Sequence, residues 1–149
     1  MASTRTSQRP RIFIDSSVLM AAAISTTGRA RDLVNLGFDG QLGLVVSDDV
    51  LEETERNLIL KAPRALPAFH HFRAVLAATL ISPSPGLVSQ VATIVEPKDA
   101  PIVAGAIQAQ ALYIATYDRK HLLNQAEKIG AEYNIIVATP DTILVQQHC

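Results

Sequence analysis

The stretch Arg11-Ile-Phe-Ile-Asp15-Ser-Ser-Val-Leu-Met20 decides the fold, because a short apolar run ends in an acid and a helix-forming segment follows at once. A run of this length that is almost wholly apolar predicts a short buried strand. Residues 16–24 are rich in Ala, Leu and Met, which favour a helix. The chain therefore begins with a strand that passes directly into a helix, and Asp15 stands where one becomes the other.

The alternation of strand and helix continues along the chain. Further short apolar runs predict strands over residues 42–46, 91–95, 111–116 and 135–138. Helical composition or spacing predicts helices over residues 16–24, 29–36, 48–60, 68–80, 100–110, 120–129 and 140–147. This alternation is typical of an α/β domain with a mainly parallel sheet. In such sheets functional groups gather outside the carboxyl ends of the strands, and Asp15 and Asp118 follow two of the predicted strands.

Length and composition fit one globular domain. The chain has 149 residues, of which 48% are hydrophobic and 18% are charged. We predict a flexible polar tail over residues 1–10 and a single domain over residues 11–149. Residues 1–10 lack the apolar core of a secretion signal, the apolar stretches are too short to cross a bilayer, and the single Cys149 cannot form an internal disulfide. These features predict a cytoplasmic protein.

The formal net charge of −1 does not exclude a nucleic-acid partner. The chain has 13 Lys and Arg against 14 Asp and Glu. If four of the acids form one metal cluster, the 13 basic side chains face only the ten remaining acids, and bound divalent ions offset the cluster itself. Phosphate binding is therefore compatible with the composition, although the composition alone does not establish it.

Four acids that border apolar segments are the candidates for such a cluster. They are Asp15, Glu53, Asp99 and Asp118. Helical spacing places Val50, Thr54 and Leu58 on one side of the predicted helix 48–60, with Glu53 at the margin of the buried face. Carboxylates that share a partly buried cleft repel one another, and a divalent cation removes that cost.

The residue types in this cluster favour a hard cation over zinc. Mg²⁺ prefers oxygen ligands, and Mn²⁺ accepts the same oxygens. A bound ion of this kind can lower the pKa of a water molecule and stabilise the charge that develops on a phosphate. The sequence has no cluster of Cys and His with zinc spacing, and we interpret His70 and His71 as surface or partly packed residues.

Four motifs give the sequence a resemblance to a known family. They are Ile14-Asp-Ser-Ser-Val-Leu19, Ser47-Asp-Asp-Val-Leu-Glu-Glu53, Lys98-Asp-Ala-Pro-Ile-Val-Ala-Gly-Ala106 and Ala115-Thr-Tyr-Asp-Arg-Lys-His-Leu122. In this order and spacing, over about residues 11–145, they resemble the PIN domain (PilT N-terminus) nucleases that are common among bacterial and archaeal toxin–antitoxin toxins. The resemblance implies a three-layer α/β/α fold around the parallel sheet.

The resemblance also implies an activity and partners. The four acids Asp15, Glu53, Asp99 and Asp118 match the family's acidic quartet, which binds the metal and supports catalysis. The protein would then be a Mg²⁺- or Mn²⁺-dependent endoribonuclease that uses one or two ions to hydrolyse phosphodiester bonds of single-stranded RNA. A toxin role would bring a protein antitoxin that places a basic side chain against the acids. Such domains are often dimers, which implies a homodimer here.

Residues next to the acids are candidates for supporting roles. The family often carries Asn at the position of Ser17 and a hydroxyl at the position of Thr116, so these two residues and Ser16 form the predicted supporting set. Basic residues near the acidic edge are candidates for phosphate contacts, although ordinary surface charge explains each one equally well: Arg29, Arg31, Arg119 and Lys120. We interpret Asp141 as an acid that stabilises the start of a helix rather than as part of the site.

The same residues allow two other interpretations. A response-regulator-like or phosphatase-like α/β domain would need paired acids near the first strand, and Asp15-Ser-Ser lacks the Asp-x-Asp pattern of phosphatases that form an aspartyl phosphate. A catalytically silent PIN-like module that binds RNA or a protein is the second reading. The presence of all four acids argues against lost activity.

Overall fold

The computed structural model describes residues 9–148, so the predicted tail, except for Arg9 and Pro10, and Cys149 lie outside the described residues. Within residues 9–148 the chain forms one five-stranded sheet with the order β3-β2-β1-β4-β5, and each neighbouring pair is parallel. The strands are β1 (Arg11–Ile14), β2 (Gly43–Ser47), β3 (Leu80–Ile81), β4 (Tyr113–Ala115) and β5 (Ile136–Ala138). The prediction of a parallel α/β sheet is confirmed.

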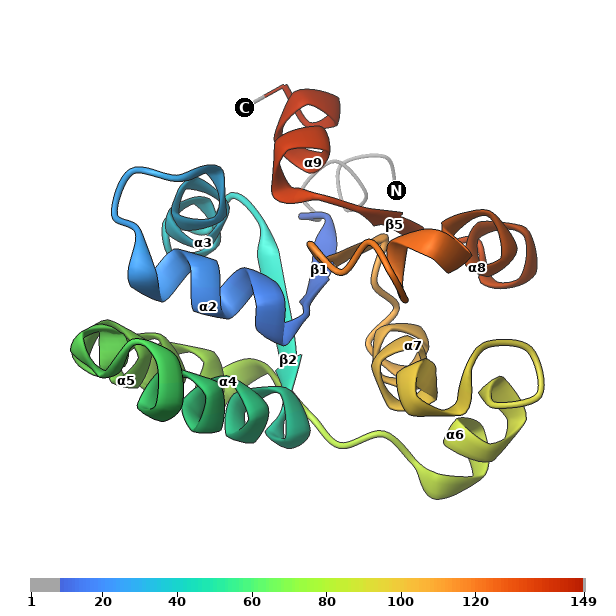
Figure 1. Cartoon of the computed structure of the whole chain (residues 1–149). Helices are drawn as coiled ribbons and strands as arrows, with labels where there is room; N and C mark the ends of the chain where they lie inside the picture. The colour runs from blue at the N-terminus through green and yellow to red at the C-terminus, as the bar shows by residue number, and fades with distance from the viewer. Residues whose placement is uncertain (1–8, 149) are drawn as a thin grey trace.

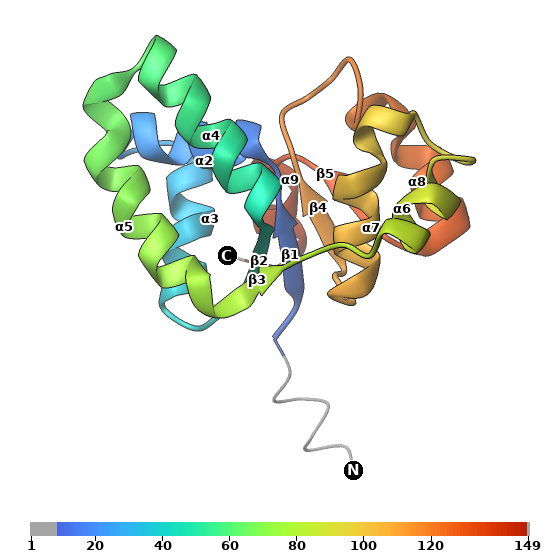
Figure 2. The ribbon, with the colours of Figure 1, turned by 90° about the horizontal axis from the view of Figure 1, so that it is seen from below.

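Helices cover both faces of this sheet, which gives three layers (Figure 1). The helices are α2 (Ser16–Ile24), α3 (Arg29–Phe38), α4 (Asp48–Lys61), α5 (Leu66–Leu76), α6 (Pro85–Val91), α7 (Ala100–Gln108), α8 (Ala126–Tyr133) and α9 (Pro140–Gln146). Helix α2 packs on α3, α4 and α5 on one side, whereas α7 packs on β1, β2 and β4 and also on α6 on the other side (Figure 2). The predicted α/β/α arrangement is therefore confirmed.

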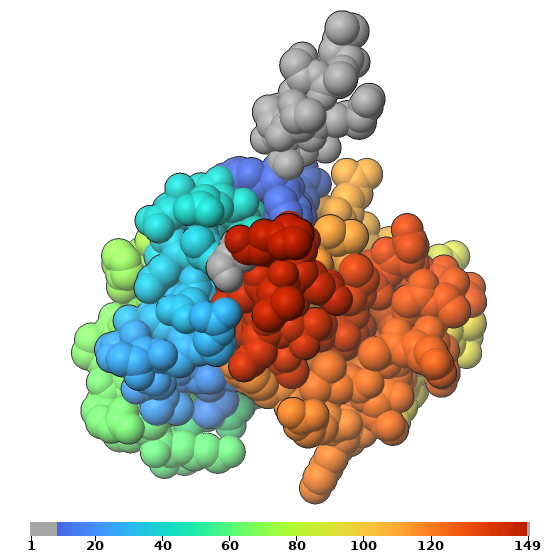
Figure 3. Space-filling model, turned by 90° about the horizontal axis from the view of Figure 1, so that it is seen from above, coloured from blue at the N-terminus to red at the C-terminus, as the bar shows by residue number. Residues whose placement is uncertain are grey.

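The C-terminal helix α9 packs on the same side of the sheet as α3. Helix α9 packs on α3 and β4, and its residues fill the surface between the N-terminal half of the chain and the segment around α8 (Figure 3). Thr139 caps this helix by accepting a hydrogen bond from the backbone N–H of Thr142. Within residues 9–148, no helix is long and apolar enough to cross a membrane.

The centre of the core is β1, which is why its sequence is apolar at every position before Asp15 except the first. Ile12, Phe13 and Ile14 are completely buried. A parallel strand that is covered by helices on both faces has no solvent side, so it needs a continuous apolar run rather than an alternating one. The register pairs Ile14 of β1 with Ala115 of β4, so the two strands end level with each other.

Helix α7 approaches β1 closely at Gly105. A Cβ atom at this position would lie 2.7 Å from Cε2 of the buried Phe13 ring. We expect Gly105→Ala to lower the free energy of unfolding by about 1–2 kcal/mol, because the cost of overpacking a core exceeds the gain in helix propensity. Gly130→Ala in α8 is the matched control: its nearest neighbour would be the Ile135 carbonyl at 3.6 Å, so it should stabilise by about 0.5–1 kcal/mol. Urea unfolding measures both, and a Gly105 variant as stable as the wild type would contradict the close approach.

Two predicted elements are wrong in the region between β2 and α7. The strand predicted for residues 91–95 is absent, because α6 ends at Val91 and the following residues form turns. The buried side chains there are Val91 and Val95, four residues apart, and the Val95 N–H donates to the Val91 carbonyl. This is the spacing of a helical turn. The β-branched composition of the segment suggested a strand that its backbone does not form.

The helix predicted for residues 68–80 has different ends. It begins at Leu66, because Pro67 occupies its first turn, where a missing N–H costs no hydrogen bond. It ends at Leu76, and Leu80–Ile81 forms the edge strand β3, which pairs with β2. A strand of two residues has too short a pattern to be recognised in a sequence. The helix predicted to begin at Lys120 begins instead at Ala126, after the 3-10 turn Leu123–Gln125.

Candidate functional site

The four predicted acids line one cleft of about 460 Å³. Asp15 lies between β1 and α2, Glu53 lies on α4, Asp99 ends the 3-10 turn that leads into α7, and Asp118 follows β4. Segments separated by about a hundred positions therefore meet at the carboxyl edge of the sheet, as the parallel topology requires. The other residues that line the cleft are Ser16, Ser17, Met20, Asn57, Lys98, Ile102, Tyr117 and Leu122.

Asp15 is held by two hydroxyl groups. Thr116 Oγ1 donates to its Oδ2 at 2.7 Å, and Ser17 Oγ donates to the same oxygen at 2.9 Å. The side chains of Asp15 and Thr116 are 8% and 0% exposed. Since Ile14 and Ala115 are paired across the sheet, Asp15 and Thr116 are the next residues of the two strands, which explains how they meet.

The same two hydroxyls also accept hydrogen bonds from the segment that carries Asp118. The backbone N–H of Asp118 donates to Thr116 Oγ1 at 3.0 Å, and that of Tyr117 donates to Ser17 Oγ at 2.9 Å. Each hydroxyl thus joins Asp15 to the loop after β4. The Ser17 hydroxyl therefore ties the first acid to Tyr117, the residue that precedes the fourth acid.

Glu53 reaches the cleft from the opposite wall. Val50, Thr54 and Leu58 are buried on the inner side of α4, whereas Glu53, which helical spacing placed at the margin of that side, is exposed and lines the cleft. Ser16 Oγ donates to Glu53 Oε2 at 3.1 Å, so the third predicted supporting residue contacts this acid. Helix α4 begins where the sequence predicts, because Ser47 Oγ accepts from the Val50 N–H.

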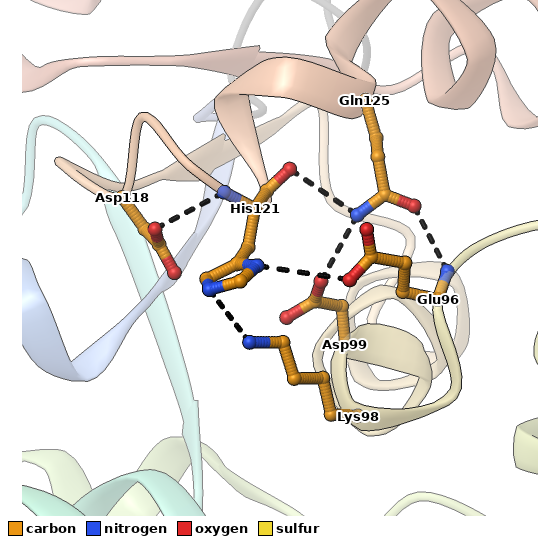
Figure 4. A network of polar contacts seen from close by, with 6 residues as sticks. All are labelled: Glu96, Lys98, Asp99, Asp118, His121 and Gln125. Carbon is orange, nitrogen blue, oxygen red and sulfur yellow. Dashed lines mark hydrogen bonds and ion pairs between the residues drawn. The ribbon is translucent and has the colours of Figure 1, made fainter.

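Asp99 is the least exposed of the four acids. It is 7% exposed, and Gln125 Nε2 donates to its Oδ2 at 2.9 Å (Figure 4). Burial raises the pKa of the Asp99 carboxyl above its ordinary value, while the Gln125 hydrogen bond and the nearby His121 and Lys98 lower it. Glu96 raises it further. The net direction is upward, so the charged form of Asp99 is held at a cost.

Gln125 was not predicted from the sequence, although it ties two acid-bearing segments together. It is 6% exposed, its Nε2 also donates to the His121 carbonyl at 3.2 Å, and its Oε1 accepts from the Glu96 N–H at 2.9 Å (Figure 4). Both N–H donors of this buried amide and one of the two acceptor sites on its oxygen are therefore used. The sequence carries no local signal for it, because its partners lie up to 29 positions away.

Three further residues beside the acids were also not predicted: Glu96, Lys98 and His121. Lys98 Nζ lies 2.6 Å from His121 Nε2, and His121 Nδ1 lies 3.6 Å from Glu96 Oε1 (Figure 4). The backbone N–H of His121 donates to Asp118 Oδ1 at 3.2 Å. Spacing could have indicated two of these residues. Glu96 precedes Asp99 by three positions, and His121 follows Asp118 by three, which is the separation of neighbours on a helical turn.

The four basic residues predicted to contact phosphate lie outside the set that lines the cleft. Arg31 Nε donates to the Ala22 carbonyl at 2.7 Å, and its guanidinium stacks 5.2 Å from the centre of the Phe72 ring. Arg29 pairs with Asp32 at 3.0 Å. The remaining two, Arg119 and Lys120, are exposed in the loop after β4.

Asp141 stays outside the acidic cluster. It is exposed in the first turn of α9, as a helix-stabilising acid would be, and it is not among the residues that line the cleft. Burial raises the pKa of the Tyr117 hydroxyl, and the charge of Asp141 adds to this effect, while Arg29 opposes it.

The donors in the cleft fit a divalent cation. Four carboxylates converge there, and among the lining residues of the described chain Lys98 is the single basic side chain. The charge is therefore unbalanced toward negative, and oxygen is the donor atom that Mg²⁺ and Mn²⁺ prefer. A second group of donor atoms, from Glu96, Asp99 and His121, lies within 4.8 Å of one another. It shares Asp99 with the first group.

Comparisons with known proteins agree with this architecture. A search of the curated proteins finds no match. Among the solved structures, the crystal structure of PAE2754 from Pyrobaculum aerophilum is similar, with a TM-score of 0.61 and 19% sequence identity, over 95% of this chain and 98% of that one. This likeness concerns the fold. A family model described as PIN domain matches residues 11–120, which is most of the chain and contains all four acids. The chain therefore belongs to the PIN domain family, whose members are generally metal-dependent nucleases.

Proposed function

We propose that the protein is a cytoplasmic Mg²⁺- or Mn²⁺-dependent endoribonuclease that hydrolyses phosphodiester bonds of single-stranded RNA. The observation that carries the proposal is the convergence of Asp15, Glu53, Asp99 and Asp118 on one cleft. These four acids are the proposed metal ligands and catalytic residues. A cation bound to them lowers the pKa of a water molecule and offsets the charge that develops on the phosphate.

Residues in and beside the cleft hold three of the acids in place. Thr116 and Ser17 hold Asp15, Gln125 holds Asp99, and Ser16 contacts Glu53. Carboxylates fixed in this way bind a cation without first being reoriented, which is the usual contribution of residues behind the ligands of a metal site. Because the cleft opens at the surface, an extended strand can reach the acids.

The proposal is tested with a labelled single-stranded oligoribonucleotide. Cleavage by the wild type should require Mn²⁺ or Mg²⁺ and should stop when EDTA is added. Glu53→Gln should slow cleavage at least about tenfold, since it removes one charge from the cleft. Glu52→Gln is the matched control and should cleave at the wild-type rate, because Glu52 is exposed on the same helix and does not line the cleft.

Two outcomes would contradict the proposal. Cleavage that ignores EDTA would exclude a metal mechanism, and equal effects of Glu52→Gln and Glu53→Gln would exclude the role of the cleft. A protein that binds RNA without cleaving it in the presence of Mn²⁺ would instead be the catalytically silent binding module.

The acidic cleft supports a regulatory extension of the same proposal, in which the protein is the toxin of a toxin–antitoxin pair. A basic side chain of a protein antitoxin, placed against the four acids, would satisfy their charge and block the cation. Co-expression of a small protein encoded by the adjacent gene should then give a soluble complex that does not cleave RNA. Size-exclusion chromatography of the same samples also measures whether the free protein is a homodimer.

A further inference from the structure

Lys98 brings a positive charge into a cleft that is otherwise acidic. Among the lining residues of the described chain it is the one cation, and its neighbour in sequence is the buried Asp99. An RNA strand brings a negative charge with each phosphate, so a cleft of carboxylates alone repels it wherever no cation intervenes. The position of the Lys98 ammonium group therefore decides whether the protein itself offers a phosphate contact inside the cleft.

The ammonium group of Lys98 is held by His121. Its Nζ lies 2.6 Å from His121 Nε2, and because an ammonium group has donors only, Nε2 is the acceptor (Figure 4). The hydrogen of the neutral ring then lies on Nδ1. This atom is buried, makes no hydrogen bond within residues 9–148, and lies 3.6 Å from Glu96 Oε1. The carboxylate of Glu96 thus favours the ring orientation in which Nε2 accepts from Lys98.

The backbone around His121 is fixed as well. The His121 N–H donates to Asp118 Oδ1, and its carbonyl accepts from Gln125 Nε2. The ring therefore projects from a turn that is tied to two residues of the site. A long, exposed lysine side chain loses conformational entropy when it is held in one place. Because His121 already holds Lys98 in the free protein, RNA binding does not incur this entropic cost.

We propose that Lys98 is a phosphate-binding residue of the cleft, and that Glu96 and His121 are positioning residues that hold its ammonium group beside the four acids. The inference rests on the proposed ribonuclease function and assigns the residue that receives a non-bridging phosphate oxygen of the substrate. It replaces the phosphate contacts predicted from the sequence, none of which lines the cleft.

The same donor atoms suggest a competing role, since Glu96, Asp99 and His121 could hold a second metal ion. A metal on Nδ1 requires the ring hydrogen to be on Nε2, where it would face the donors of Lys98 at 2.6 Å. The ring cannot accept from Lys98 and bind a metal at Nδ1 in the same state. The 2.6 Å contact between Lys98 Nζ and Nε2 fits the state in which the ring accepts from Lys98, and counting the bound Mn²⁺ ions separates the two roles.

The test measures binding of a fluorescein-labelled single-stranded oligoribonucleotide by fluorescence anisotropy at several salt concentrations, with Ca²⁺ replacing the catalytic ion. Lys98→Gln removes the charge, and Lys98→Arg retains it. Lys128→Gln is the matched control, because it removes an equal charge from an exposed position on α8 outside the cleft. His121→Ala, alone and combined with Lys98→Gln, completes a double-mutant cycle. Calorimetric titration with Mn²⁺ counts the ions that each variant binds.

We expect Lys98→Gln to reduce the slope of log affinity against log salt by about 0.7, the value of one phosphate contact with a single strand. Its affinity should fall about fivefold, the upper range for an exposed ion pair. Lys98→Arg and Lys128→Gln should keep the wild-type slope. His121→Ala should weaken RNA binding in the wild type but not in Lys98→Gln, and it should leave the number of bound Mn²⁺ ions unchanged.

Several results would overturn the inference. An unchanged slope for Lys98→Gln, or no binding of the oligoribonucleotide by the wild type, removes the phosphate contact. Loss of a bound Mn²⁺ ion in His121→Ala assigns the cluster to a metal instead. The proposed function fails separately, because it is tested by Mn²⁺-dependent cleavage: a wild type that binds RNA with the expected slopes but cleaves nothing keeps the Lys98 contact and loses the nuclease.

Discussion

A protein carrying Asp99→Asn is expected to cleave RNA about 10²–10³-fold more slowly than the wild type and yet to be at least as stable when no divalent ion is present. The loss of rate is that of one preorganised charge removed from a catalytic site. The stability follows from burial. Asp99 is 7% exposed, and burial raises the pKa of its carboxyl, so its ionised form is penalised by folding. Asn removes that penalty and can still accept the hydrogen bond from Gln125 Nε2.

The sign of this effect with pH follows from linkage. Below the ordinary pKa of 3.8, Asp99 is protonated in both the folded and the unfolded chain and carries no penalty. As the pH rises through the interval between 3.8 and the raised pKa, the unfolded chain ionises first and the folded chain loses stability relative to it. The advantage of the variant should therefore be present near neutral pH and should disappear in acid.

Thermal and urea unfolding, near neutral pH and in acid, measure the difference in stability between the variant and the wild type. Addition of Mn²⁺ provides the internal control. A ligand that binds only the folded state stabilises it by about 2.7 kcal/mol at one hundred times its dissociation constant. The wild type should gain this stability and the variant much less, so the order of the two proteins should reverse when Mn²⁺ is added. A variant that is less stable without the ion, or equally stabilised by it, would show that Asp99 is a structural acid.

The positions of the four acids follow from rules that a sequence can express. Asp15 directly follows the parallel strand β1, and Asp118 lies three residues after the end of β4. The carboxyl ends of parallel strands meet at one edge of the sheet. Glu53 is placed by helical spacing, since Val50, Thr54 and Leu58 define the buried side of α4. Asp99 has no strand before it. The sequence marks it only by the apolar helix that follows, and the resemblance to PIN domains implies its place in the acidic quartet.

The residues that hold the acids could not be placed in this way. Gln125 contacts Asp99 because a 3-10 turn, rather than the predicted helix, carries it back toward α7. Lys98 meets His121 across 23 positions, and an exposed lysine and a half-buried histidine give no sign of such a contact in a sequence. Periodicity reports which side of an element is buried, whereas these contacts depend on how two loops approach each other in three dimensions.

Apart from the late start of α8, the errors in the fold lie outside the cleft. The missed strand β3 is two residues long at the edge of the sheet, and the segment 91–95 packs two valines at helical spacing in a turn. Neither segment supplies a residue that lines the cleft. The central strands β1 and β4 were recognised because burial on both faces leaves a continuous apolar run, and these are the strands that position Asp15 and Asp118.

Thr116→Val is expected to damage both the stability of the protein and its affinity for Mn²⁺. Thr116 is completely buried, its hydroxyl donates to Asp15 Oδ2 at 2.7 Å, and it accepts from the Asp118 N–H at 3.0 Å. Valine has nearly the same shape but lacks both interactions, so the Asp118 N–H loses this acceptor and Asp15 Oδ2 loses one of its two hydroxyl donors. We expect the free energy of unfolding to fall by about 1–3 kcal/mol and the affinity for Mn²⁺ to fall about 10–100-fold.

Two variants separate the role of this hydroxyl from general packing. Thr116→Ser keeps the hydroxyl and should keep most of the Mn²⁺ affinity. Thr54→Val removes another completely buried hydroxyl, one that donates only to the Val50 carbonyl of its own helix at 2.7 Å, and it should leave the affinity unchanged. Calorimetric titration with Mn²⁺ gives the affinity of the folded protein, which a change in stability alone does not alter. If Thr116→Val binds Mn²⁺ as tightly as Thr54→Val does, then the Thr116 hydroxyl does not orient Asp15 for the ion, and the strand together with the Ser17 hydroxyl is enough to hold this acid.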